Sequence, residues 1–273
     1  MITRTCTSHS VNEAIGAELV TDGGFAAVTE GAEIIASEND RTLAGASNWV
    51  NVDIGSYDAT GDLSLVSSAA QQYCRLPVAN APQSPKKTYV IRFDLSGYTQ
   101  GGWYIKDFLG NTISGDIVGD GAKVIYFTPT EGTGGLRIVA INTVSDGNFD
   151  NFSLKEVTFT SWTAGIGWAP QATAGSLTGK AQKVAGTASD LEQDVSAVAV
   201  DVYRVVHTAT RTAGSETAEV GGTGGAARST ADTFTDNIRA ATTGNLKIGA
   251  DASFAGTVDT FSCKRIIRRA APD

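Results

Sequence analysis

The chain has 273 residues, of which 41% are hydrophobic, enough for two domains that each bury a core. Its formal net charge of −8 argues against a general nucleic-acid-binding protein, which needs a basic surface to displace counterions from phosphates. No stretch approaches the roughly 20 apolar residues of a membrane-spanning helix, and Met1–Gly16 lacks the apolar core of a secretory signal. We therefore expect a soluble protein that is made in the cytoplasm.

The cysteines and histidines do not suggest a metal or redox centre. Cys6, Cys74 and Cys263 form an odd set without a CxxC pair, and only His9 and His207 could join them. We expect free, mostly buried thiols and no zinc site.

The chain opens with a segment that differs from the rest. Residues 1–17 carry few apolar side chains, and only Asn12–Ala17 hints at a short helix. We predict a short N-terminal arm here, 1–17, which becomes ordered when it binds a neighbouring subunit.

Short alternating segments then follow one another to the end, separated by turns such as "DATGD" and "TEGTGG". The strands predicted in the first half are Asp62–Ser68, Gln71–Val78, Tyr89–Leu95, Trp103–Phe108, Lys123–Thr128, Leu136–Val144 and Asn151–Phe159. Those predicted in the second half are Ala181–Val184, Leu191–Val195, Tyr203–Thr210, Glu216–Val220, Asp232–Ala240, Leu246–Ala250 and Val258–Ile267. Seven or eight short strands per half without intervening helices predict an all-β protein of two antiparallel β-sandwiches, most simply jelly rolls.

One phrase occurs twice. "GNFDNFSLKEV" begins at Gly147 and "GTVDTFSCKRI" begins at Gly256, and each follows a similar strand, "GLRIVA" or "GNLKIGA". Such collinear similarity indicates an internal repeat with a period of about 110 residues. We interpret the phrase as the closing strand of each sandwich, with these shared structural residues: Gly147, Asp150, Phe152, Gly256, Asp259 and Phe261. This interpretation gives tandem domains at 18–158 and 159–273, the second a degenerate repeat of the first.

The order of these motifs resembles a known family. "ELVTDGGFAAVTEG", then Trp49, "KTYVIRFDLSG", "KVIYFTPTEGTGGLRIVA" and the closing phrase are similar to jelly-roll modules related to carbohydrate-binding and galactose-binding-like domains. Such modules are common in virion proteins of tailed bacteriophages and related particles. The second half keeps the Tyr203 strand and the closing phrase but lacks the "TDGGF" opening.

The resemblance implies a structural calcium ion near the chain ends of such a module. The residues that correspond to its ligands are Asp22 and Asp150, with Asp259 as the equivalent of Asp150 in the second half. The alternative is that the Asp of "NFDNF" only accepts backbone hydrogen bonds where a strand begins.

A glycan site is suggested by one aromatic segment, "SGYTQGGWYIKDF", because sugar rings stack on aromatic rings while polar groups hold their hydroxyls. The candidate residues are Tyr98, Gln100, Trp103, Tyr104, Lys106 and Asp107. On a strand, Trp103 and Tyr104 point to opposite sides, so only one of them can lie in the core. The alternative is that one ring fills the sandwich and the other covers its rim.

No catalytic signature is present: the sequence has no GxSxG, HExxH or Walker loop, and we predict a protein without enzymatic activity. The leading hypothesis is a homo-oligomeric structural virion protein, a spike, fibre or decoration subunit that binds other virion proteins through its arm. The competing hypothesis is an adhesin that binds a cell-surface polysaccharide, and a binding module of a secreted glycosidase is the third. None of them involves nucleic acid or membrane insertion.

Overall fold

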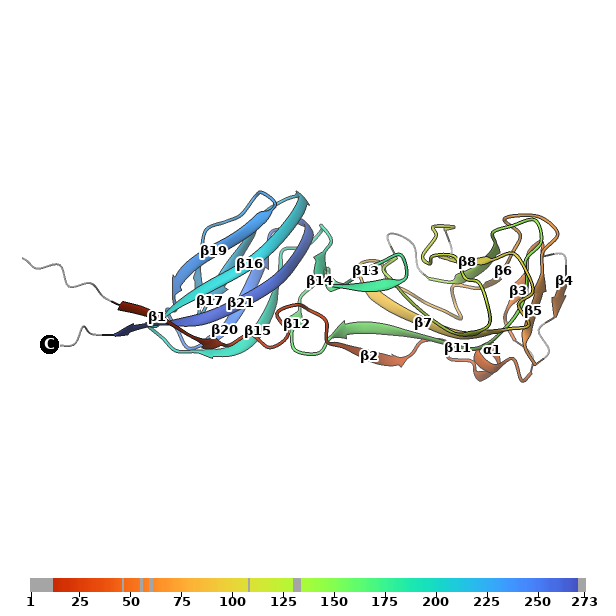
Figure 1. Ribbon diagram of the computed structural model, residues 1–273, viewed down its shortest axis with the longest axis horizontal. Helices are drawn as coiled ribbons and strands as arrows, with labels where there is room; N and C mark the ends of the chain where they lie inside the picture. Colours follow the sequence, from red (N-terminus) through yellow and green to blue (C-terminus); the bar gives the residue numbers. More distant parts are fainter. Residues whose placement is uncertain are drawn as a thin grey trace, which may run out of the picture. The chain divides into compact units, whose positions relative to one another are not determined.

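The computed structural model describes residues 12–45, 47–54, 56–58, 61–107, 109–129 and 134–269. These residues form antiparallel β-sheets and a single five-residue helix, α1 (Glu38–Thr42) (Figure 1). No helix of the described residues is long and apolar enough to cross a membrane. The predicted all-β class is confirmed, and Phe108, at the end of one predicted strand, lies outside the described residues.

The chain divides into two compact units that are not consecutive in sequence. One, the inserted unit, comprises residues 25–160 and 167–184; the other, the flanking unit, comprises 12–24, 161–166 and 185–269 of the described chain. The division differs from the predicted boundaries, 18–158 and 159–273, because the residues before 25 group with the second half of the chain. The first strand and the last strand of the flanking unit thus lie on either side of the inserted unit in sequence.

Strand β1 (Asn12–Glu18) explains this grouping. It pairs antiparallel with β21 (Ala255–Arg269), with Ile15 opposite Ile266 (Figure 1). The expected helical piece at 12–17 is therefore a strand, and of the predicted arm only residues 1–11 lie outside the described chain.

Glu18 joins the end of β1 to β21. Its carboxylate accepts hydrogen bonds from the backbone N–H groups of Leu19 (3.1 Å), Val20 (3.1 Å) and Cys263 (2.8 Å), and from the Ser262 hydroxyl (2.5 Å). Partial burial opposes ionisation, but these four hydrogen bonds together lower the pKa of Glu18.

The inserted unit repeats this arrangement. Strand β2 (Val28–Glu33) pairs with β11 (Asp146–Phe159). Glu33 accepts hydrogen bonds from the N–H groups of Ile34 (3.1 Å), Ile35 (3.0 Å) and Leu154 (2.8 Å), and from the Ser153 hydroxyl (2.6 Å). The segments "GAELV" (16–20) and "GAEII" (31–35) therefore mark the equivalent ends of the first strands, one in each unit.

Two sheets form the inserted unit. In one, the strand order is β4 (Ser56–Asp58), β5 (Leu63–Val66), β11, β7 (Thr88–Ser96) and β9 (Gly121–Phe127), with β2 alongside β11. In the other it is β3 (Val50–Asn51), β6 (Tyr73–Leu76), β10 (Leu136–Ala140) and β8 (Trp103–Asp107). Buried aromatic residues from both sheets pack in the core, with ring centroids 5.4 Å apart for Trp103 and Phe149 and 5.6 Å for Phe93 and Phe149.

The flanking unit has the same kind of layers. In one sheet, β12 (Thr163–Ala164), β15 (Ser189–Ala197), β20 (Gly244–Ala250), β17 (Glu216–Val220) and β18 (Thr223–Gly224) are neighbours in that order. The other contains β1, β21, β16 (Val202–Ala213) and β19 (Asp232–Arg239). Strands β13 (Trp168–Thr173) and β14 (Ser176–Lys183) form a hairpin that groups with the inserted unit.

The repeated closing phrase marks the same irregularity in both units. Asn151 and Thr260 have left-handed backbone angles (φ 55° and 53°), and the strand register shifts beside each. The preceding Asp150 and Asp259 side chains accept the N–H of these residues, at 2.6 and 2.7 Å. After each bulge the next residue, Phe152 or Phe261, is buried.

The two repeated glycines also occupy crowded positions. A Cβ on Gly256 would lie 2.1 Å from the Thr210 carbonyl oxygen, and one on Gly147 would lie 2.7 Å from the Leu95 side chain. The Gly, Asp and Phe residues that recur in the two phrases therefore determine the backbone shape of the closing strand in each unit.

Candidate ligand-binding face

The structure divides the predicted aromatic segment between two sides of a sheet. Trp103 is fully buried against Phe149, and Asp107 is buried and accepts the N–H and the Nδ2 of Asn111, both at 2.8 Å. Tyr104 and Lys106, the residues between them on β8, are half-buried on the opposite side. Only Tyr104 and Lys106 therefore remain on the outer side of this strand.

Tyr98 and Gln100 lie in the loop that precedes β8. The Tyr98 hydroxyl donates to the Gly101 carbonyl (2.7 Å), its N–H donates to Asp120 (2.8 Å), and its ring packs against the core. Gln100 is exposed. Tyr98 thus holds the loop in place, and neither residue belongs to the face of the sheet.

Two rows of side chains cross the outer side of the sheet that contains β8. In the first row Val139 of β10 lies opposite both Tyr104 of β8 and Tyr73 of β6. In the second row Arg137 lies opposite both Lys106 and Arg75. We call this surface the outer face, and it comprises Tyr73, Arg75, Tyr104, Lys106, Arg137 and Val139.

The side chains of the two rows contact one another. The Arg137 guanidinium lies 5.0 Å from the centre of the Tyr73 ring, and Lys106 Nζ lies 5.9 Å from the centre of the Tyr104 ring. Lys106 Nζ also donates to Gln71 Oε1 (3.0 Å). Val139 is only 3% exposed although it points outward, because its neighbours cover it.

Hydrogen bonds to the backbone hold the segments at both edges of the outer face. Residues 111–117 run beside β8. Trp103 forms an isolated antiparallel backbone pair with Ile117, and Lys106 forms one with Thr112. On the far side, the carboxylate of Asp53 accepts the N–H of Tyr73 (2.8 Å), and exposed Val50 lies opposite Arg75. The face is thus an extended, half-exposed surface with two aromatic rings and three cations.

The flanking unit has an equivalent sheet, in which β15, β20 and β17 take the places of β6, β10 and β8. "LKIGA" in β20 corresponds to "LRIVA" in β10, so Lys247 takes the place of Arg137. In the matching positions Lys247 lies between Glu192 and Glu219, and Gly249 lies between Asp190 and Thr217. The matched face has no aromatic side chain at these six positions.

Carboxylates dominate the electrostatics of the matched face. Lys247 Nζ lies 3.5 Å from Asp190 and 3.6 Å from Glu192. Burial disfavours its charged form, but Asp190, Glu192 and Glu219 together raise the pKa of Lys247.

The predicted calcium ligands fall in different units. Asp22 belongs to the flanking unit, where its carbonyl oxygen accepts the Trp162 indole N–H (3.2 Å), and Asp150 belongs to the inserted unit. Asp150 and its equivalent Asp259 each accept the backbone N–H of the next residue at a bulge inside β11 or β21. Within the described chain, no three His, Cys, Asp or Glu residues lie together as a metal site would require.

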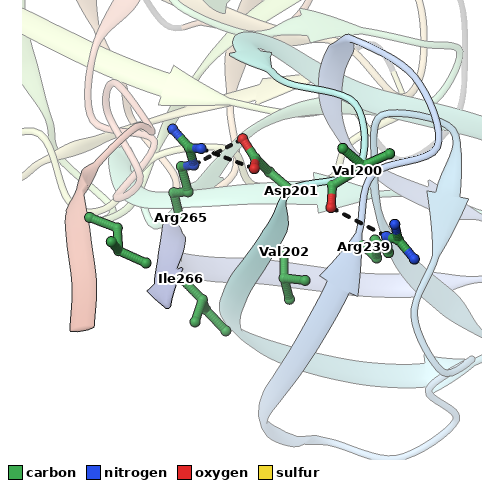
Figure 2. A pocket seen from close by; sticks show the side chains of 7 residues that line it. Val200, Asp201, Val202, Arg239, Arg265 and Ile266 are labelled. Carbon is green, nitrogen blue, oxygen red and sulfur yellow. Dashed lines mark hydrogen bonds and ion pairs between the residues drawn. The ribbon is translucent and has the colours of Figure 1, made fainter. Parts of the chain in front are cut away.

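A hollow of about 660 Å³ lies at one end of the flanking unit, lined by Val200, Asp201, Val202, Arg239, Arg265, Ile266 and Ile267. Figure 2 shows that its arginines are engaged by the protein. Arg265 pairs with both carboxylate oxygens of Asp201 (2.9 and 3.0 Å), and Arg239 donates to the Val200 carbonyl (3.2 Å). The lining residues include no aromatic ring, so the outer face is the better candidate for a glycan site.

Sequence reasoning missed Tyr73, Arg75 and Arg137 as members of this face. Alternation in "QYCRLP" and "LRIVA" could have placed them on the outward side of their own strands. It could not have shown that β6, β10 and β8 are neighbours, because β7 and β9, which belong to the other sheet, lie between them in sequence.

No protein-family model matches the chain, and no curated protein shows significant sequence similarity to it. Among solved structures, the chain is similar to the N-terminal CBM22-1–CBM22-2 tandem domain of Xyn10C from Paenibacillus barcinonensis (10% identity, 88% of this chain and 98% of that one, TM-score 0.30). It is also similar to the tandem CBM51 modules of Sp3GH98, a family 98 glycoside hydrolase from Streptococcus pneumoniae SP3-BS71 (10% identity, 89% and 93%, TM-score 0.25). TM-scores this low do not establish a shared fold.

Proposed function

We propose that the inserted unit is a non-catalytic carbohydrate-binding module and that its outer face is the binding site. The observation that carries the proposal is the row Tyr73–Val139–Tyr104, in which two half-exposed rings flank an apolar side chain. The apolar C–H face of a sugar ring stacks on such rings.

The spacing of the rings favours a chain over a single sugar. Tyr73 and Tyr104 lie on β6 and β8, two strands apart across β10, so their backbones are about 10 Å apart. Gln71, Lys106 and Arg137 lie beside the rings and offer hydrogen bonds to hydroxyl groups.

The biological role and assembly that the sequence suggested stay predictions. They comprise a structural virion protein at the surface of a phage-like particle, homo-oligomers, attachment through the N-terminal arm, and a structural calcium ion. A glycan-binding face suits a virion subunit, an adhesin and a binding module of a glycosidase equally well.

The proposal is tested by binding of the full chain to a glycan array that includes plant, animal and bacterial polysaccharides. We expect Tyr73→Ala/Tyr104→Ala to weaken binding at least about fivefold, because each ring contributes roughly 0.5–1.5 kcal/mol. Tyr126→Ala is the matched control, since Tyr126 is a half-buried tyrosine on β9 in the other sheet of the same unit.

Two outcomes would contradict the proposal. One is a folded wild-type protein that binds no glycan on the array. The other is a double variant that binds as tightly as the wild type while its thermal unfolding is unchanged.

A further inference from the structure

We infer that the outer face selects acidic polysaccharides, chains whose sugars carry carboxylate or sulfate groups. The inference rests on the proposed function and concerns the same site. It comes from the second row of the face, Arg75–Arg137–Lys106, which runs parallel to the row that contains the two tyrosines.

The cation row places like charges side by side on three neighbouring strands. Directly opposite residues on neighbouring antiparallel strands have Cβ atoms about 5 Å apart, and like charges in such pairs are destabilising. Here two such pairs share Arg137. An anionic ligand that lies across this row would meet three cations at once.

The fold does not require these charges. In the matched row of the flanking unit, one lysine lies between two glutamates, Glu192–Lys247–Glu219. The same strand register therefore accepts the opposite charge at both outer positions. A general excess of basic residues does not account for the three cations either, because the whole chain carries a net charge of −8.

The chemistry of the row suits carboxylates and sulfates. Guanidinium groups present paired N–H donors that match two oxygens of one anionic group, and the lysine ammonium adds a third cation. The adjoining tyrosine row offers apolar ring faces to the sugars that carry those groups. An acidic polysaccharide satisfies both rows at once, whereas a neutral glycan uses only one.

The test is affinity electrophoresis of the full chain through gels that contain paired polymers. Polygalacturonate is compared with its methyl-esterified form, and dextran sulfate with dextran, so that each pair differs in charge on one backbone. Single-stranded RNA serves as an acidic polymer without the sugar-ring surface of a polysaccharide.

We expect at least one charged polymer to bind at least tenfold more tightly than its neutral partner, and the pair that discriminates identifies carboxylate or sulfate as the group. Arg75→Gln/Arg137→Gln/Lys106→Gln should abolish that preference and flatten the dependence of binding on salt. The matched control is Lys247→Gln, which removes a cation from the equivalent position of the flanking unit and should leave binding unchanged.

Equal binding to charged and neutral partners would overturn the inference while leaving carbohydrate binding intact. Binding to RNA as tight as binding to the charged polysaccharides would also overturn the inference. So would self-association of the protein at low salt that the triple variant abolishes, since the cations would then bind a second copy of the chain. A protein that binds neutral glycans on the array but neither charged polymer would refute the inference alone, and a protein that binds no glycan at all would refute the proposed function as well.

Discussion

The inserted unit and the flanking unit share the positions that shape the backbone and differ at the positions that face outward. Both have a Glu at the end of the first strand, Glu33 or Glu18, that accepts the N–H of the closing strand. Both have a bulge after an Asp in that closing strand. The outward rows carry tyrosines and cations in one unit and three carboxylates around one lysine in the other. The comparison shows that the sheet framework tolerates very different surfaces.

The comparison extends into the core. Trp103 on β8 lies opposite Ala140, and Glu216 on β17 lies opposite the equivalent Ala250. Glu216 is buried, and its Oε1 is 2.8 Å from Nε2 of His207, which is also fully buried. One unit fills this position with an indole ring and the other with a polar pair.

The largest expected effect concerns the buried Glu216–His207 pair, which takes the place of Trp103 in the flanking unit. Glu216→Leu should lower the free energy of unfolding of the flanking unit by about 3 kcal/mol, because it leaves His207 buried without its partner. His207→Leu/Glu216→Leu should recover most of that loss, since both polar groups are then removed together. The measurement is urea unfolding of each variant.

The polar pair would prove unimportant if the single and the double variant unfolded at the same urea concentration as the wild type. If the double variant were the less stable one, packing around His207 and its neighbours Phe234 and Phe261 would dominate over the hydrogen bond.

The second prediction tests which residues belong to which unit. Glu18→Ala should destabilise the flanking unit and Glu33→Ala the inserted unit, each by about 2 kcal/mol, because backbone N–H groups lose their acceptor. Cys263 and Cys74 are buried free thiols, one in each unit. Burial raises the pKa of both, that of Cys263 to about 12, so each thiol should react only when its unit opens.

Thiol labelling of the two variants in a Cys6→Ser background therefore reports each unit separately. Glu18→Ala should accelerate the labelling of Cys263 and not that of Cys74, and Glu33→Ala should do the reverse. If Glu18→Ala instead exposed Cys74, the first strand would belong with residues 25–160, as in the tandem division expected from the sequence.

The smallest expected effect concerns the bulges. Thr260→Gly should stabilise the flanking unit by up to about 1 kcal/mol, because a β-branched residue is strained at a left-handed φ. Asn151→Gly should change the inserted unit less, since Asn tolerates this conformation. Thermal unfolding of the two variants checks both, and a destabilising Thr260→Gly would show that the Thr260 side chain contributes more than its strain costs.

Local patterns in the sequence were enough to place most strands. Glu216–Val220 agrees residue for residue, and the alternation in "WYIKD" correctly separates Trp103 from Tyr104. The first strands were missed because "GAELV" and "GAEII" are close together in sequence, far from the period of about 110 residues that the closing phrases suggested. Only Tyr104 and Lys106 of the outer face were predicted, since residues such as Tyr73 and Arg137 join it through strand order, which periodicity does not encode.

The insertion of one unit into the other also dictates the order in which the chain can fold. Strand β1 leaves the ribosome early, but its partner β21 is made only after the inserted unit is complete. The inserted unit has its own first and closing strands, so it can fold while synthesis continues. The flanking unit must wait, with β1 unpaired from β21, for a contact between two segments far apart in sequence, and such long-range pairing is slow. A stretching force applied near the N-terminus would likewise peel β1 from β21 first, opening the flanking unit before the inserted one.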